Sequence, residues 1–157
     1  MKPTVQELEV QVPKNNVVCW KEGTDPAKVA KMKLKQRSTL TEFFKTCLRE
    51  KHQPLSEQRR TIRGKVGPHA FELKYHEMPK YYTWNKPKRR WERRQRYEDK
   101  LGRLWDFDVC QGEVFYLRRL LVYAVGPISF GSLLQGAPTF KEAAYRQGLF
   151  IENKGIL

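Results

Sequence analysis

The chain of 157 residues contains few cysteines and no long apolar run. Its three cysteines are widely spaced and form no Cys-x-x-Cys pair, which argues against a disulfide scaffold or a zinc cage and favours a reducing compartment. No stretch reaches the roughly 18 consecutive apolar residues of a membrane-spanning helix. The N-terminal sequence has no apolar run followed by a small-residue cleavage site, so we expect no secretory signal there. These absences argue against a membrane-spanning or secreted protein.

Motifs for nucleotide hydrolysis and metal-dependent cleavage are also missing. The nearest approach to a P-loop is residues 126–131, Gly-Pro-Ile-Ser-Phe-Gly, but Ser-Leu follows where Lys-Ser/Thr would bind phosphate and magnesium. His52, His69 and His76 lack the close spacing of a His-x-His nuclease pair. A serine or cysteine triad would assemble only in the fold, and no local signature supports one. We therefore expect no catalytic residues, no metal and no cofactor in this chain.

Positive charge is what the chain has in excess. It contains 31 Lys and Arg against 17 Asp and Glu, which gives a net charge of +14 and a pI near 9.9. Residues 80–103 hold ten of the cations and only three acids, a net charge of +7 and half of the total. This excess favours an anionic partner: nucleic acid first, a membrane surface second and an acidic protein third.

Aromatic residues are interleaved with these cations. Cations neutralise phosphates, and aromatic faces stack on unpaired bases, so the mixture predicts a surface that binds single-stranded nucleic acid. The alternative is a solvated basic face with its aromatic side chains in the core. We favour binding for the charges and burial for the aromatics, because buried aromatics are commoner than stacking platforms. The four arginines that flank Trp91 are expected to form one cationic surface. The candidate binding residues are Lys86, Lys88, Arg89, Arg90, Arg93, Arg94, Arg96, Tyr82, Trp84 and Trp91.

Hydrophobic patterning predicts an α+β fold in one domain, with a short N-terminal β-hairpin, mixed short strands and three to four helices. Alternation over residues 5–12 and a turn at 13–16 before a second short strand at 17–20 indicate the hairpin. The expected segments are the hairpin (1–20), a Lys-rich connector that is mobile or marginally helical (21–38), a helix (39–50), a loop (51–69), basic and aromatic strands (70–108) and a helical end (109–150).

Helix-capping signals place the helix boundaries. Thr39 and Glu42 have the spacing of a capping box, and the apolar positions that follow repeat with helical periodicity. The same spacing recurs in Thr139 and Glu142, and Gly148 stands where a helix-ending glycine belongs. The expected core residues are Phe43, Phe44, Leu117, Leu121 and Phe140.

Seven blocks of sequence follow one another along the chain: LEVQVP, NVVCW, STLTEFF, YHEMPKYYTWN, KRRWERR, GRLWDFDVCQGEVFYLRRLLVYAVGPISFGSLL and APTFKEAAYRQGL. These blocks, in this order, resemble one stretch of the eukaryotic Helitron transposase. In that family the stretch joins the rolling-circle nuclease region to the DNA helicase. The similarity runs from about Val5 to Leu149. GEVFYLRRLL with GPISF and PTFKEA is its most specific part.

The resemblance implies a nuclear mobile-element protein whose parent unwinds DNA with ATP during rolling-circle transposition. The family's nuclease motif would lie upstream and its P-loop downstream, so ATP and magnesium are expected only for the full-length parent. The chain would then be a non-catalytic, DNA-binding accessory segment, in contact with the nuclease and helicase regions of the same polypeptide. Because the family's polypeptide would continue after the PTFKEA helix, we expect a truncated remnant or a fragment.

Two other interpretations remain open from the sequence. The charge alone also fits a stand-alone basic protein that associates with RNA or the ribosome. The reading frame could also be a decayed copy without a selected function. Single-stranded DNA is the expected ligand, RNA is the alternative, and no membrane partner is expected.

Overall fold

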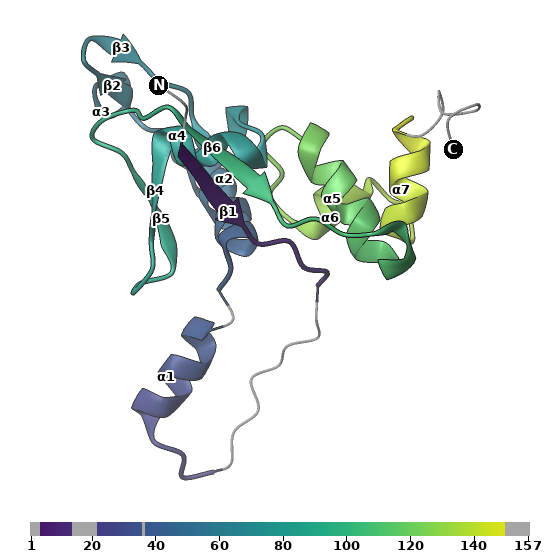
Figure 1. The fold of residues 1–157 in the computed structure, drawn as a ribbon. Coiled ribbons are helices and arrows are strands. Elements are labelled where there is room, and N and C mark those ends of the chain that lie inside the picture. The colour runs from purple at the N-terminus through teal and green to yellow at the C-terminus, as the bar shows by residue number, and fades with distance from the viewer. Residues whose placement is uncertain (1–3, 14–21, 36, 150–157) are drawn as a thin grey trace.

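The computed structural model describes residues 4–13, 22–35 and 37–149, and these form an α+β fold (Figure 1). The fold class expected from the sequence is confirmed. Four of its α-helices have seven residues or more, and the other helices are shorter. In chain order the elements are β1 (Thr4–Leu8), α1 (Pro26–Lys35), α2 (Thr39–His52), α3 (Glu57–Arg60), β2 (Thr61–Ile62), β3 (Lys65–Val66), the 3₁₀ turns η1 (Ala70–Glu72) and η2 (Tyr75–Glu77), α4 (Met78–Tyr81), β4 (Tyr82–Asn85), β5 (Arg90–Arg93), β6 (Lys100–Leu104), the 3₁₀ turn η3 (Val109–Gln111), α5 (Glu113–Tyr123), α6 (Phe130–Leu134) and α7 (Phe140–Arg146).

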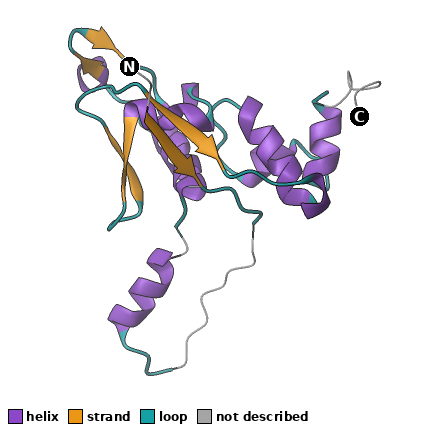
Figure 2. Ribbon diagram, viewed as in Figure 1, coloured by secondary structure: helices purple, strands orange, loops and turns teal. Residues whose placement is uncertain are grey.

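The N-terminal strand is confirmed, but its neighbour in the sheet is a strand much later in the sequence, β6. The described strands form three two-stranded sheets (Figure 2). In one of them β1 pairs in parallel with β6, so that Leu8 lies opposite Leu104 on the buried face and Val5 opposite Leu101 on the exposed face. The second strand of the expected hairpin, at residues 17–20, lies outside the described residues. Among the described residues, the sheet partner of β1 is β6.

Helix α2 begins at Thr39 as expected and runs to His52, but its N-cap is Ser38 and not Thr39. Ser38 is the N-cap: its hydroxyl accepts the Thr41 N–H over 3.1 Å, and the Thr41 hydroxyl accepts the Ser38 N–H over 2.9 Å. Glu42 instead forms an ion pair with Lys45. The box is built by a Ser-x-x-Thr pair, because the threonine hydroxyl reaches back as a glutamate would.

The expected connector and loop both contain regular structure. Helix α1 occupies most of the connector and lies apart from the core, beyond the β4–β5 hairpin (Figure 1). The loop at 51–69 holds α3 and the β2–β3 hairpin, whose turn has Arg63 at φ 53° and Gly64 at φ 79°. Helix α3, with four residues, and the two-residue strands β2 and β3 bury too few apolar residues to produce a periodic signal in the sequence.

The core lies between α2, the β-strands and the helices α5 to α7. All five residues expected in the core are buried. Helix α7 is capped as predicted, since the Thr139 hydroxyl accepts the Glu142 N–H over 3.1 Å. Gly148, at φ 78°, ends it by donating to the Tyr145 carbonyl, and Leu149 donates to the Ala144 carbonyl, which together form a Schellman motif.

Candidate nucleic-acid interface

The basic and aromatic segment folds into the β4–β5 hairpin, whose two faces differ in chemistry. Strand residues alternate between faces, and the antiparallel register places Trp84 opposite Trp91. One face therefore carries Tyr82, Trp84, Trp91 and Arg93 and packs toward α2. The other carries Thr83, Asn85, Arg90 and Glu92. The aromatic and the polar residues of the segment are separated by the pleat of the strands.

Two of the three candidate stacking residues belong to the core. Trp91 is 3% exposed, and Tyr82 is 2% exposed. The Tyr82 hydroxyl donates to the buried carboxylate of Glu50, which also accepts the Ala70 N–H over 3.0 Å. Burial, with the negative charge of Glu50 beside it, raises the pKa of Tyr82 well above its usual value. The structure thus corrects the assignment of Tyr82 and Trp91 as base-stacking residues, because neither ring has a face open to a base.

Arg93 and Arg94 are engaged inside the protein. The Arg93 guanidinium donates to the Pro68 carbonyl over 2.8 Å and to the Tyr97 hydroxyl over 3.0 Å. Arg94 donates through Nε to the Pro79 carbonyl over 2.7 Å and lies 3.5 Å from the Glu98 carboxylate. These side chains fasten the hairpin to neighbouring segments. They do not form one open cationic surface with the other arginines around Trp91.

Arg89 anchors the end of the hairpin. It adopts φ 48°, and its Nε donates to the Arg37 carbonyl over 2.7 Å. Its guanidinium also lies 3.7 Å from the Glu9 carboxylate. Asn85 closes the turn by accepting the Lys88 N–H over 3.0 Å. The tip of the hairpin is thus held in place by the segments on either side of it.

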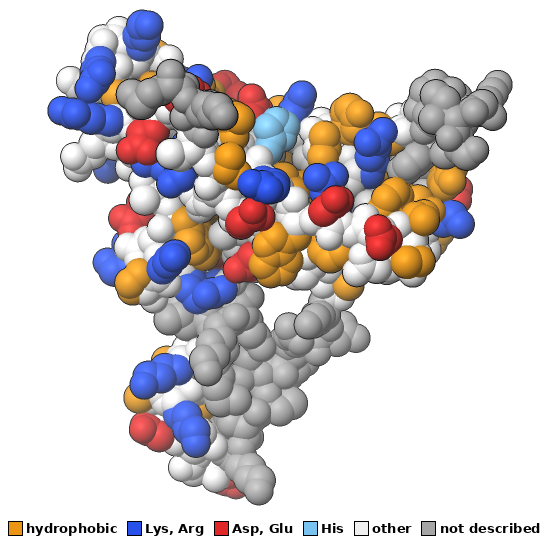
Figure 3. All heavy atoms as spheres, in the orientation of Figure 1, with side chains coloured by type: hydrophobic (Ala, Val, Ile, Leu, Met, Phe, Trp, Pro, Cys, Tyr) orange, Lys and Arg blue, Asp and Glu red, His pale blue; other side chains and the backbone are white. Residues whose placement is uncertain are grey.

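The remaining cations of the hairpin face solvent. Lys86 and Lys88 stand in the turn, Arg90 begins β5, and Arg96 follows it; all four are exposed. Figure 3 shows basic side chains gathered where the hairpin ends. Glu92, on the same face as Arg90, accepts a hydrogen bond from the Asn85 amide, and this bond together with the nearby cations lowers its pKa. We call the group Lys86, Lys88 and Arg90 the hairpin tip.

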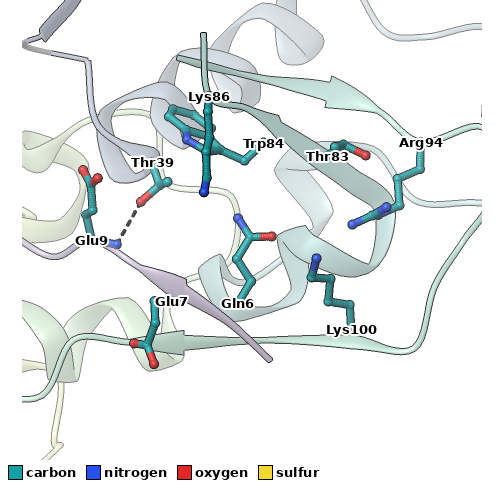
Figure 4. A pocket seen from close by; sticks show the side chains of 9 residues that line it. All are labelled: Gln6, Glu7, Glu9, Thr39, Thr83, Trp84, Lys86, Arg94 and Lys100. Carbon is teal, nitrogen blue, oxygen red and sulfur yellow. Dashed lines mark hydrogen bonds between the residues drawn. The ribbon is translucent and has the colours of Figure 1, made fainter. Parts of the chain in front are cut away.

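A pocket of about 410 Å³ opens between β1 and the hairpin (Figure 4). In the close view the side chains of Lys86, Arg94, Lys100 and Gln6 point toward its centre, and the Glu7 carboxylate points away. The pocket brings together three of the candidate residues, namely Trp84, Lys86 and Arg94. Its lining residues are Gln6, Glu7, Glu9, Thr39, Thr83, Trp84, Lys86, Arg94 and Lys100. We call it the Trp84 pocket.

Further exposed cations lie on α2, α3 and the β2–β3 hairpin, outside the segment that the sequence singled out. A second hollow, of about 290 Å³, has Arg49, Arg59 and Arg93 in its lining, with Glu50 among them. Arg63 and Lys65 are exposed at the nearby turn. The charge count over residues 49–65, six Lys and Arg against two Glu, is the signal that would have found them.

The chain matches no protein-family model and no curated protein. Within residues 4–13, 22–35 and 37–149, no group of three or more His, Cys, Asp or Glu is arranged to hold a metal ion. In the same residues no helix combines the length and the apolar character needed to cross a membrane.

Proposed function

We propose that the chain binds single-stranded DNA through the hairpin tip, as a non-catalytic accessory segment of a Helitron-type, ATP-dependent DNA helicase that acts in rolling-circle transposition in the nucleus. The observation that carries the binding role is the exposure of Lys86, Lys88 and Arg90 at the end of an anchored hairpin. The family, the nuclear location and the neighbouring nuclease and helicase regions rest on the resemblance of the sequence blocks.

Anchoring makes the hairpin tip suited to phosphates. The indole of Trp91 and the guanidiniums of Arg89 and Arg93 hold the strands against the rest of the fold. The cations at the tip are therefore presented on a backbone that need not be ordered on binding, which limits the entropic cost of association. Each cation that neutralises a phosphate releases condensed counterions, so affinity gained this way falls as salt concentration rises.

The decisive experiment compares two triple variants that lose the same charge. Lys86→Gln/Lys88→Gln/Arg90→Gln removes the hairpin tip, and Lys45→Gln/Lys141→Gln/Arg146→Gln removes three exposed cations from α2 and α7. Affinity for a 20-nucleotide single strand is measured over a salt series. If each tip cation contacts one phosphate, the slope of log affinity against log salt falls by about 0.7 per contact, or about two units in all, in the first variant only. Equal slopes in the two variants would contradict the proposal.

RNA is the alternative ligand, because the cations of the hairpin tip can bind the phosphates of either nucleic acid. Contacts from Lys86, Lys88 and Arg90 to phosphates do not distinguish ribose from deoxyribose. Competition between a DNA strand and an RNA strand of equal length and sequence separates the two, because only contacts to the 2′-hydroxyl favour RNA. Stronger competition by RNA would support a stand-alone RNA-associated protein in place of a transposition factor.

A further inference from the structure

We infer that the Trp84 pocket holds one unpaired nucleotide of the bound strand, with the base against the Trp84 ring and the phosphate among the cations of the pocket. This inference rests on the proposed function and adds to it a reason for preferring single strands. The hairpin tip offers only charge, and its outer face carries no aromatic ring, so the tip alone would bind duplex and single strand through the same phosphate contacts.

The Trp84 ring is held in a fixed orientation. It is half-buried and packs against Trp91 with ring centroids 5.2 Å apart and planes inclined at 61°. Trp91 is itself fixed by its hydrogen bond to the Thr39 carbonyl. The part of Trp84 that Trp91 does not cover lines the pocket. A ring already ordered in the free protein loses little rotamer freedom when a base stacks on it.

Positive charge dominates the pocket although two glutamates line it. Lys86, Arg94 and Lys100 point toward the centre from three different segments (Figure 4). The Glu7 carboxylate lies 3.4 Å from Arg103, and the Glu9 carboxylate lies 3.7 Å from Arg89, so both acids have cationic partners. The Arg94 guanidinium already donates a hydrogen bond to the Pro79 carbonyl and forms an ion pair with Glu98. Lys86 and Lys100 are therefore the main phosphate contacts in this inference.

Besides the aromatic ring and the cations, the pocket has polar side chains that can form hydrogen bonds with a nucleotide. The Gln6 amide points into the pocket, and Thr83 lines it on the hairpin side (Figure 4). An amide both donates and accepts hydrogen bonds, so it can meet the edge of any base. The volume of about 410 Å³ falls within the range of about 300–1,000 Å³ typical of small-ligand pockets. An aromatic ring, two or three cations and an amide together match a phosphorylated nucleoside better than inorganic phosphate or an apolar ligand.

Base pairing would exclude duplex DNA from this pocket. In a double helix each base is stacked between its neighbours and cannot reach the Trp84 ring without being extruded. The pocket therefore adds affinity only for unpaired strands. Loss of Trp84 should reduce the preference for single strands, and loss of the hairpin tip should reduce the affinity for both forms.

The test measures the affinity of each protein for a 20-nucleotide single strand and for the duplex of the same sequence. Trp84→Leu is expected to weaken single-strand binding by roughly 5- to 150-fold and to leave duplex binding unchanged. Trp84→Phe keeps a ring and should retain most of the preference. Trp105→Leu removes another partly exposed tryptophan and is the matched control, with no effect on either affinity.

A second variant keeps the test valid if Trp84→Leu fails to fold. Lys100→Gln leaves the aromatic packing intact and should lower the salt slope for the single strand by about 0.7, with no change for the duplex. Lys45→Gln is its control. A mononucleotide such as dAMP should compete only weakly, because it lacks the neighbouring phosphates that contact the hairpin tip.

Three results would overturn the inference: no loss of single-strand affinity in Trp84→Leu and Lys100→Gln, an equal loss for the duplex, or binding of dAMP as tight as that of the 20-nucleotide strand. The last result would indicate a site for free nucleotides. If tip-dependent binding persists while Trp84 has no effect, only the pocket fails. If the unmodified protein binds no strand at low salt, the proposed function fails as well.

Discussion

The indole Nε1–H of Trp91 donates a hydrogen bond to the backbone carbonyl oxygen of Thr39 over 2.9 Å. This bond joins the β4–β5 hairpin to the first turn of α2, where the Thr39 hydroxyl also accepts the Glu9 N–H and donates to the Tyr75 hydroxyl, which in turn donates to the Glu9 carbonyl. The position of the hairpin tip thus depends on Trp91, which is buried in the core. Binding and stability can therefore be tested with different substitutions in the same hairpin.

We predict that Trp91→Ala lowers the free energy of unfolding by roughly 3–5 kcal/mol, because it removes a large buried side chain and leaves a cavity. Urea denaturation at neutral pH measures this change. Trp105→Ala is the control. Trp105 is 44% exposed, so this substitution should lower the free energy of unfolding much less. Equal costs for the two variants would place Trp91 at the surface and contradict the packing described above.

Arg93→Gln is expected to destabilise the protein by about 1–3 kcal/mol, because it removes the donor to the partly buried Pro68 carbonyl and one of the two hydrogen bonds of the Tyr97 hydroxyl, which keeps its bond to the Arg60 carbonyl. Arg96→Gln, three residues later and exposed, should leave the urea midpoint unchanged. Replacing all four arginines around Trp91 would accordingly mix lost stability with lost binding. A midpoint for Arg93→Gln equal to that of Arg96→Gln would show that the internal bonds of Arg93 contribute nothing.

The Cys47 thiol should make stability fall as the pH rises above 9. Burial, reinforced by the nearby Glu50 carboxylate, raises its pKa from 9.0 to about 12, and its Sγ lies 3.5 Å from the Ala70 carbonyl. The folded state therefore keeps a proton that the unfolded chain releases, so the stability is complete below pH 9 and is lost between pH 9 and 12. The expected slope is up to about 1.4 kcal/mol per pH unit.

Measurements between pH 9 and 10 isolate this effect, because Tyr75 and Tyr82, whose pKa values are also raised, contribute chiefly above pH 10. Cys47→Ala should flatten the dependence of unfolding free energy on pH in that interval. Cys110→Ala, at the exposed cysteine, should not. The same slope in both variants would assign the pH dependence to other groups.

Gly126 cannot be replaced without moving its neighbour. It has φ +59°, and a Cβ atom built there would lie 2.0 Å from the Phe71 carbonyl oxygen. Gly136 has φ +85° but open space around it. Gly136→Ala should cost roughly 1–2 kcal/mol of backbone strain alone, and Gly126→Ala should cost more, because Phe71 must also shift. Thermal unfolding compares them, and equal shifts would argue against the close approach.

The sequence was most informative where a long amphipathic element meets a capping residue. Helix α7 follows its Thr139 cap and its Gly148 stop, and the apolar stripe of α2 is buried as its spacing predicts. The α2 cap was misplaced by one residue because Ser38 and Thr39 can both cap, and only the backbone geometry decides between them. The segment Thr61–Val66 gave no signal, because a hairpin with two residues per strand has almost no core face.

The candidate binding site was predicted in composition but not in arrangement. Sequence identifies a run of arginines, yet it does not say which of them, such as Arg93, find carbonyl partners and which, such as Arg90, remain in solvent. The Trp84 pocket could not be predicted from the sequence for another reason. Gln6 and Lys100 reach it from β1 and β6, which are far apart in the sequence, and a contact between such distant segments leaves no local pattern.

The parallel pairing of β1 with β6 also sets an order of events during synthesis. β1 leaves the ribosome before β6, which begins only at Lys100, so the two strands cannot pair until the segments between them have also been made. Contacts between distant segments close late because a long loop must first be ordered. Until then Leu8 and Val10, both buried in the folded protein, are exposed to other chains and to chaperones.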